Sequence, residues 1–261
     1  MKVIGHRGAA SLAPENTFAG FDIARSLGVD AVETDVQQTL DGKLVLFHDD
    51  SLRRVAGIDA KVQELTWEEL RQIDIGSSFN PAYADQRVPL LTDFLDRYGD
   101  LAIDLEIKQP GIADEVTKMV DGSGHRENIT YTSFDFDTVA RAKILSPDIR
   151  AGLLTTDISD EMIARVKGAG LEQYCPIARL VTPELVTKWK QKDGLYVRAW
   201  GVDNGMVMQQ AVKAGVDGMT VDFPHLLLDE IGRGEQAREV VADLRSRGLS
   251  KTETHTGGER E

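Results

Sequence analysis

The chain has 261 residues, of which 41% are hydrophobic and 28% charged, and its formal net charge at pH 7 is -13. These proportions are typical of a soluble globular protein. The negative charge argues against binding to nucleic acids or to anionic membranes, which depends on basic surfaces.

Cys175 is the single cysteine, so an intramolecular disulfide is excluded, and its place in an apolar run indicates an unreactive core residue. No apolar run approaches the ~18 residues of a membrane span. The apolar start of the chain is also too short for a signal peptide. We therefore expect a cytoplasmic protein without stable membrane association.

The first part of the chain is typical of a strand–helix–strand unit. Residues 2–5 form a short apolar strand that leads to His6. Apolar residues then recur at helical spacing over residues 18–27, Gly28 ends the helix, and the next strand begins at Ala31. Such units build parallel sheets.

A hairpin is predicted over residues 31–50. Glu33 and Asp35 are two residues apart in the strand-like run Val32-Glu33-Thr34-Asp35-Val36, so both carboxylates share one face of the strand. Asp41-Gly42 then predicts a tight turn, and the connection is too short for a parallel crossover. We expect an antiparallel hairpin in which His48 lies roughly opposite Asp35, on the face of the two carboxylates.

The next regular strand comes at residues 101–108, after an irregular excursion over about residues 49–89 and a helix over residues 90–98. Its apolar residues occupy one face. A second face that is wholly charged belongs to a site rather than to a core. The residues on that charged face are Asp104, Glu106 and Lys108.

From residue 112 helices and strands alternate regularly. Further strands are expected at residues 129–133, 150–154, 173–177, 196–200 and 218–221. With the three earlier strands this makes eight, the number that closes a (β/α)8 barrel, whose sites lie at the carboxyl ends of the strands. We predict an α/β fold, a TIM barrel with an antiparallel hairpin arm and a small insertion after the second strand. A doubly wound open sheet is the alternative, but no G-x-G-x-x-G follows the first strand.

The end of the chain differs in composition from the rest. Residues 236–247 are typical of an amphipathic helix, whereas residues 250–261 are polar and contain no aliphatic residue. We expect residues 1–249 to form a single domain and residues 250–261 to form a disordered tail.

Reactive side chains gather at the expected carboxyl ends of the strands. Three carboxylates without a thiolate suit a hard, oxygen-binding cation, Mg²⁺ or Ca²⁺. Two histidines can act as general base and general acid, and an arginine and a lysine can bind an anion such as phosphate. This combination is typical of phosphodiester cleavage. The residues are His6, Arg7, Glu33, Asp35, His48, Asp49, Glu106 and Lys108.

Each of these residues also has a simpler structural interpretation. His6 and Glu106 could be buried groups with ordinary hydrogen-bond or ion-pair partners. For three further residues at strand ends the structural interpretation is favoured. Ser133 would bind a backbone group, Trp200 would be an aromatic plug, and Asp222 would cap a helix.

The ordered set of short motifs resembles that of the glycerophosphodiester phosphodiesterases over about residues 3–231. The motifs are His6-Arg7-Gly8, Pro14-Glu15-Asn16-Thr17, Glu33-Thr34-Asp35-Val36, Asp41-Gly42, Phe47-His48-Asp49, Glu106-Ile107-Lys108, Ser133-Phe134, Trp200 and Gly218-Met219-Thr220-Val221-Asp222.

The resemblance implies a PLC-like phosphodiesterase TIM barrel that hydrolyses glycerophosphodiesters to glycerol 3-phosphate and an alcohol. It also implies roles by position: metal ligands Glu33, Asp35 and Glu106; acid–base residues His6 and His48; phosphate contacts Arg7 and Lys108; and Trp200 as a wall for the glycerol. The excursion over residues 49–89 resembles the small insertion of the cytosolic bacterial type. The chain departs from the family at Gly201-Val202-Asp203-Asn204, where Thr-Val-Asn is usual, and at Asp50, which replaces a common proline.

Two other functions stay open. A lysophospholipase D or related lipid phosphodiesterase would need an apolar lip for the acyl chain, and the sequence contains no strong one. A non-catalytic ligand-binding barrel would be expected to lack a histidine or a metal carboxylate, and none is missing. The sequence leaves open the leaving alcohol, the choice of cation, the division of labour between the histidines, a cyclic phosphate intermediate and the oligomeric state.

Overall fold

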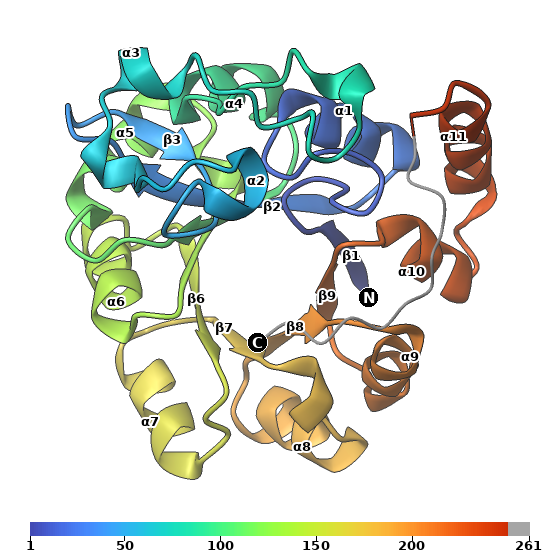
Figure 1. The fold of residues 1–261 in the computed structure, drawn as a ribbon. Coiled ribbons are helices and arrows are strands. Elements are labelled where there is room, and N and C mark those ends of the chain that lie inside the picture. The colour runs from blue at the N-terminus through green and yellow to red at the C-terminus, as the bar shows by residue number, and fades with distance from the viewer. Residues whose placement is uncertain (250–261) are drawn as a thin grey trace.

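The computed structural model describes residues 1–249, so the predicted tail over residues 250–261 lies outside the described part. Of the nine strands of the sheet, all but β3 (Leu44–Leu46) pair in parallel, and β1 pairs with both β9 and β2, which closes the barrel. The predicted TIM barrel is therefore confirmed (Figure 1). The parallel strands are β1 (Lys2–Gly5), β2 (Ala31–Gln38), β4 (Ile103–Ile107), β5 (Ile129–Ser133), β6 (Arg150–Thr155), β7 (Gln173–Pro176), β8 (Tyr196–Val202) and β9 (Gly218–Val221).

Helices surround the barrel (Figure 1). Several begin at a residue whose side chain accepts a hydrogen bond from the first turn, namely Thr17, Asp135, Ser159, Thr182 and Asn204. The α-helices outside the insertion are α1 (Phe18–Leu27), α4 (Leu91–Tyr98), α5 (Ala113–Ser123), α6 (Phe136–Leu145), α7 (Asp160–Gly168), α8 (Pro183–Thr187), α9 (Gly205–Ala214), α10 (Pro224–Glu230) and α11 (Glu235–Ser246). Short 3-10 or π turns are η3 (Arg126–Asn128), η4 (Ala178–Leu180) and η5 (Lys188–Lys192).

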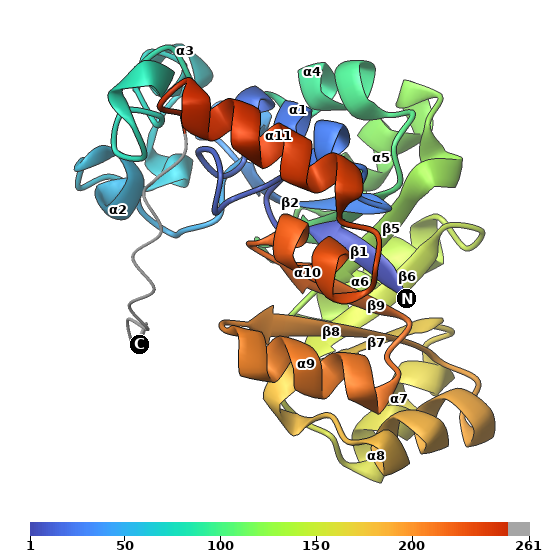
Figure 2. The ribbon, with the colours of Figure 1, turned by 90° about the vertical axis from the view of Figure 1, so that its right-hand side faces the viewer.

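The insertion, residues 49–89, contains α2 (Arg53–Ala56), η1 (Val62–Glu64), α3 (Trp67–Leu70) and η2 (Pro81–Tyr83). It lies at the end of the barrel toward which β8 points (Figure 2). A hydrophobic cluster of its own, separate from the main core, holds it together. The buried members of this cluster are Val45, Phe47, Leu52, Val55, Val62, Leu70, Ile75 and Val88.

The predicted amphipathic helix near the end of the described chain is α11, which packs along the outside of the barrel on α1 and α10 (Figure 2). Just beyond it, the Gly248 carbonyl accepts a hydrogen bond from Asn80 Nδ2 of the insertion at 2.9 Å. The segment after α11 therefore touches the insertion. Within residues 1–249, no helix combines the length and apolar character needed to cross a membrane.

The hairpin is antiparallel as predicted, but the predicted register is wrong by one residue. Val36 pairs with Leu46, and the N–H of Phe47 donates to the carbonyl of Asp35 at 3.0 Å. The connection is a three-residue loop that ends on Gly42 at φ +78°, a left-handed conformation typical of such hairpins. The extra loop residue places Phe47, rather than His48, opposite Asp35, and His48 follows one position later.

Asp104 lies on the predicted inward face but outside the predicted site. In the ladder between β2 and β4, Asp104 pairs with Glu33. It precedes Glu106 by two residues, so its side chain lies one layer deeper in the barrel than that of Glu106. Its Oδ2 is 3.3 Å from Nε of Arg198, a side chain that is 1% exposed. The charge of Asp104 is thus matched by a buried ion pair, and only the outer part of the charged face belongs to the site.

Candidate active site

The structure brings the predicted polar residues together at the carboxyl ends of the first strands. His6 and Arg7 follow β1 directly, Glu33 and Asp35 lie in β2, and Glu106 lies in β4. Lys108 follows β4, and His48 lies just after the hairpin arm. Because parallel strands end at one edge, residues far apart in sequence converge there.

Three buried carboxylates form the centre of the site. Ligand oxygens of Glu33, Asp35 and Glu106 lie within 4.8 Å of one another, and the Asp35 side chain is fully buried. Burial, together with the neighbouring carboxylates, raises the pKa of Glu33 and of Glu106. Burial also opposes ionisation of Asp35, but the charges of Arg7, His48 and Lys108 lower its pKa to about 2.

This cluster fits a hard divalent cation. Glu33 Oε1 and Asp35 Oδ1 are buried and accept no hydrogen bond, which is costly for carboxylate oxygens. A cation held by the three carboxylates would satisfy these oxygens and offset the repulsion between them. An all-oxygen donor set suits Mg²⁺ or Ca²⁺.

Two cationic side chains border the carboxylates. Arg7 Nε is 3.4 Å from Asp35 Oδ2, and Lys108 Nζ is 3.0 Å from Glu106 Oε1 and 3.7 Å from Asp35 Oδ1. Burial alone would lower the pKa of Lys108, but Asp35 and Glu106 raise it, so the amine stays charged. Both cations are placed to attract an anion at the mouth of the site.

Arg7 is also held through its backbone. Its N–H donates to Glu33 Oε2 at 3.0 Å, and its φ of +51° is a left-handed conformation that few non-glycine residues adopt. Such conformations cost of order 1–3 kcal/mol and persist only where the surroundings enforce them. The loop after β1 is therefore fixed by its contacts with the site.

His6 is oriented by Asp222. The distance from His6 Nδ1 to Asp222 Oδ1 is 2.5 Å, and His6 Nε2 is 3.8 Å from Glu33 Oε2. The carboxylate thus holds the ring with Nε2 toward the carboxylate cluster. The prediction that Asp222 caps a helix is wrong, because α10 begins after Phe223 and has no side-chain cap.

His48 is held in the same way by its neighbour. Its Nδ1 is 2.7 Å from Asp49 Oδ1, which leaves Nε2 as the nitrogen for proton transfer. His48 is close enough to the cluster for its charge to lower the pKa of both Asp35 and Glu106. The two histidines therefore approach one cluster from different segments of the chain.

Asn16 is a site residue that the sequence interpretation missed. Its Nδ2 donates to Asp35 Oδ2 at 2.8 Å, and its Oδ1 accepts from Thr34 Oγ1 at 2.8 Å. Asn16 also has a φ of +51°, in the left-handed region that asparagine tolerates better than most residues. The sequence signal is the motif Pro14-Glu15-Asn16-Thr17, which by its pattern alone indicates only the entry to a helix.

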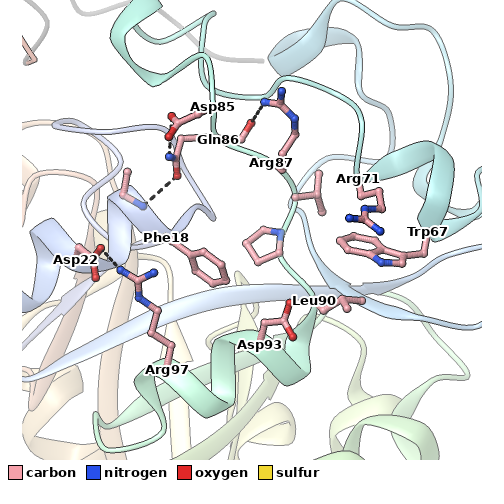
Figure 3. Close-up of a pocket in the computed structure, with 13 residues that line it drawn as sticks. Phe18, Asp22, Trp67, Arg71, Asp85, Gln86, Arg87, Leu90, Asp93 and Arg97 are labelled. Atoms are coloured by element: carbon pink, nitrogen blue, oxygen red, sulfur yellow. Dashed lines mark hydrogen bonds and ion pairs between the residues drawn. The ribbon is translucent and has the colours of Figure 1, made fainter.

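A groove of about 550 Å³ lies elsewhere, on the outer side of the barrel between α1, α4 and the insertion (Figure 3). Phe18 and Trp67 line it together with the ion-paired Asp22 and Arg97. None of the predicted catalytic or metal-binding residues is among its lining residues. We therefore place the candidate site at the strand ends, where the acids, histidines and cations meet.

Comparison with known proteins identifies the family. The family model described as "Glycerophosphoryl diester phosphodiesterase family" matches residues 6–226. The chain belongs to this family. The predicted family, and with it the prediction of an enzyme, is confirmed.

Relatives of this family match nearly the whole chain. A glycerophosphodiester phosphodiesterase from Caldanaerobacter subterraneus subsp. tengcongensis is 34% identical, over 89% of this chain and 98% of the relative. The crystal structure of a glycerophosphodiester phosphodiesterase from Agrobacterium tumefaciens matches with a TM-score of 0.78 at 26% identity, over 88% of this chain and 99% of that chain. A phosphodiesterase from Oleispira antarctica, solved with the product sn-glycerol-3-phosphate, matches with a TM-score of 0.80 at 26% identity, over 88% of this chain and 96% of that chain.

In this family member, Trp200 stands at the rim of the site. Its Nε1 donates to the Cys175 carbonyl at 2.9 Å, and its ring meets Phe134 edge-on at a centroid distance of 4.7 Å. Lys108 Nζ lies 5.8 Å from the centre of the Phe134 ring, which connects this aromatic pair to the cations. Ser133 donates its hydroxyl to the Ile107 carbonyl at 2.8 Å, as the structural interpretation predicts.

Proposed function

We propose that this chain hydrolyses glycerophosphodiesters to glycerol 3-phosphate and an alcohol, with a divalent cation and acid–base catalysis by His6 and His48. The observation that carries the proposal is the convergence of three buried carboxylates with two carboxylate-oriented histidines. Family membership supports the substrate class, and so does the product bound to the Oleispira antarctica relative.

The chain's own residues would bind and orient the phosphodiester. Arg7 and Lys108 would bind the phosphate oxygens, since both keep a positive charge beside the carboxylates. Trp200 and Phe134 would form an apolar wall for the glycerol. When bound by Glu33, Asp35 and Glu106, the cation would supply Lewis-acid polarisation of a phosphate oxygen.

The two histidines would divide the proton transfers. We assign His6 Nε2 to take a proton from the nucleophile and His48 Nε2 to give one to the departing alkoxide, because His6 ends the first barrel strand whereas His48 follows the hairpin arm. Asp222 and Asp49 would hold the rings by accepting from Nδ1. A nucleophilic water and an internal attack by the glycerol 2-hydroxyl both fit this assignment.

The test is turnover of glycerophosphocholine, followed by a coupled assay for glycerol 3-phosphate, with and without EDTA. We expect activity that EDTA abolishes and that Mg²⁺ or Ca²⁺ restores. Turnover of lysophosphatidylcholine but not of glycerophosphocholine would instead indicate a lipid phosphodiesterase. No turnover of either substrate at any divalent cation would indicate a non-catalytic barrel.

A second experiment addresses the nucleophile. Product formed in ¹⁸O-labelled water, with a search for a cyclic glycerol phosphate at early times, separates direct attack by water from attack by the 2-hydroxyl.

The cytoplasmic location that the composition predicts stays a prediction.

A further inference from the structure

One arginine of the insertion contacts two carboxylates at the edge of the site. Arg54, in α2, donates from Nε to Asp49 Oδ2 at 2.6 Å and from Nη2 to Asp49 Oδ1 at 3.0 Å. It also donates from Nη1 and Nη2 to the two oxygens of Glu15, at 2.7 Å and 2.6 Å. A single planar guanidinium thus makes bidentate contacts with two acids from different loops.

Each of these acids holds one residue of the proposed machinery. Asp49 Oδ1 is 2.7 Å from His48 Nδ1, and Glu15 Oε1 accepts from Arg7 Nη1 at 2.9 Å. Arg54 is therefore connected to His48 through the carboxylate of Asp49, and to Arg7 through the carboxylate of Glu15.

The charge of Arg54 is needed where it lies. Ligand atoms of Glu15, His48 and Asp49 lie within 4.8 Å of one another, a spacing that also suits a metal ion. The guanidinium already supplies the positive charge that these acids require, so the trio is better explained as an ion-paired support. Without it, two partly buried carboxylates would face each other with no bidentate partner.

The insertion provides a firm base for this arginine. Val55, next to Arg54, is 7% exposed and Leu52 is fully buried, and both belong to the hydrophobic cluster of the insertion. The neighbouring Arg53 has no such role, because its partner is Asp59, which is 77% exposed.

We propose that Arg54 is a positioning residue that sets His48, through Asp49, and Arg7, through Glu15, in their working orientations. In this role it would act through Asp49 and Glu15 rather than by contact with the reacting atoms. The insertion thereby contributes to catalysis through one side chain. This inference rests on the proposed function of His48 and Arg7.

The test compares Arg54→Ala, Arg54→Lys and the control Arg53→Ala. We expect Arg54→Ala to lower kcat/KM for glycerophosphocholine by roughly 10- to 100-fold, the usual effect of removing a group that orients a site residue. Lysine offers a point charge in place of a planar fork, so Arg54→Lys should recover only a small part of the loss. Arg53→Ala should stay within twofold of the wild-type kcat/KM and keep its melting temperature, whereas the two Arg54 variants should melt somewhat lower but stay folded at the assay temperature.

Chemical rescue separates positioning from a general loss of structure. Guanidinium chloride at low millimolar concentration, far below denaturing conditions, should restore part of the activity of Arg54→Ala, whereas the same concentration of NaCl should not. The proposal is overturned if Arg54→Ala keeps wild-type kcat/KM, or if guanidinium fails to restore activity to a variant that circular dichroism shows to be folded at the assay temperature.

The same assay includes His48→Ala and Arg7→Ala. If these two variants keep full activity, the proposed function fails. If they lose activity while Arg54→Ala does not, the proposed function stands and only the role of Arg54 fails.

Discussion

At the scale of single residues, the two histidines are held by the same chemistry at different sequence distances. His48 uses the next residue, Asp49, whereas His6 uses Asp222, which is 216 positions away. In each case an oxygen of the carboxylate lies against Nδ1, which fixes the ring and directs the other nitrogen to the site. Identical support for both rings is consistent with two rings that each move a proton.

The assignment of His48 as general acid predicts a dependence on the leaving group. An alkyl alcohol is a poor leaving group, so His48→Ala should lower turnover of glycerophosphocholine by ~10²–10⁴, the usual contribution of acid–base catalysis. A p-nitrophenyl phosphodiester leaves without a proton donor, so the loss on that substrate should be far smaller. His6→Ala should lower turnover of both.

Steady-state kinetics of both variants on both substrates measure this. Equal losses for His6→Ala and His48→Ala on the two substrates would contradict the division of labour, and so would an unimpaired His48→Ala variant.

The three buried carboxylates predict the effect of removing one charge at a time. Glu33→Gln, Asp35→Asn and Glu106→Gln should each weaken binding of the divalent cation and lower activity while the fold persists, since each change keeps the shape of the side chain. Calorimetric titration with Mg²⁺ and Ca²⁺ measures the affinity, and circular dichroism checks the fold. Undiminished affinity in all three variants would show that the cation binds elsewhere. Asp104→Asn, one layer deeper and paired with Arg198, is the matched control.

Local pattern predicts some of these residues and not others. Strand alternation alone is enough to place Glu33, Asp35 and Glu106 on inward faces, as the ladder between β2 and β4 confirms. The contact between Asp222 and His6 forms only when the barrel closes. Asn16 reaches Asp35 only through a left-handed loop residue, and no alternation pattern encodes such a conformation.

At the scale of elements, Asp30 connects three segments near the amino end of β1. Its Oδ2 accepts from the Val3 N–H at 2.8 Å, and both of its oxygens accept from Arg233, which lies between α10 and α11. Burial opposes ionisation, but the hydrogen bonds from Arg233 and Val3 lower the pKa of Asp30 below its ordinary 3.8.

The lowered pKa predicts a pH-dependent loss in Asp30→Asn. Because the folded pKa lies below the unfolded one, the stabilisation is complete above about pH 3.8 and is lost as the pH falls through the folded value. At pH 7 we expect a loss of about 1 kcal/mol, since the partly exposed pair is screened by solvent. Urea unfolding at pH 7 and at a pH below 3.8 where the wild type is still folded measures the difference.

The exposed Asp59→Asn serves as a control, with little expected loss at either pH. A loss in Asp30→Asn that is equal at both pH values would contradict the charge-based explanation.

The order of helices and strands was largely predictable from the sequence, whereas the hairpin register and the contacts made by the insertion were not. Alternating helices and strands indicate the eight barrel strands, because periodicity is local. The hairpin register depends on whether the loop has two or three residues, and Gly42 is compatible with both. The place of Arg54 depends on how the insertion folds over the strand ends, which short-range pattern does not encode.

At the scale of the whole molecule, the segment after α11 reaches the insertion. Leu249 packs against the main core, and the Gly248 carbonyl accepts from Asn80. Residues 250–261, by contrast, contain no aliphatic side chain whose burial could stabilise a contact with the barrel. A chain that ends at Leu249 should therefore keep the wild-type melting temperature and turnover, as measured by calorimetry and the phosphodiesterase assay. A drop of several degrees would show that residues 250–261 bind to the barrel.

The closure of the barrel also bears on the order of folding. β1 pairs with β2 on one side and with β9 on the other. Its pairing with β9 therefore joins strands from the two ends of the chain, as does the contact between His6 and Asp222, which are 216 positions apart. Long-range pairing of this kind carries a large entropic cost of loop closure, which slows folding. During synthesis, the first strand emerges long before the partner that completes it. Until β9 arrives, one edge of β1 is unpaired and His6 lacks Asp222, so the catalytic centre is completed in the same late event that seals the barrel.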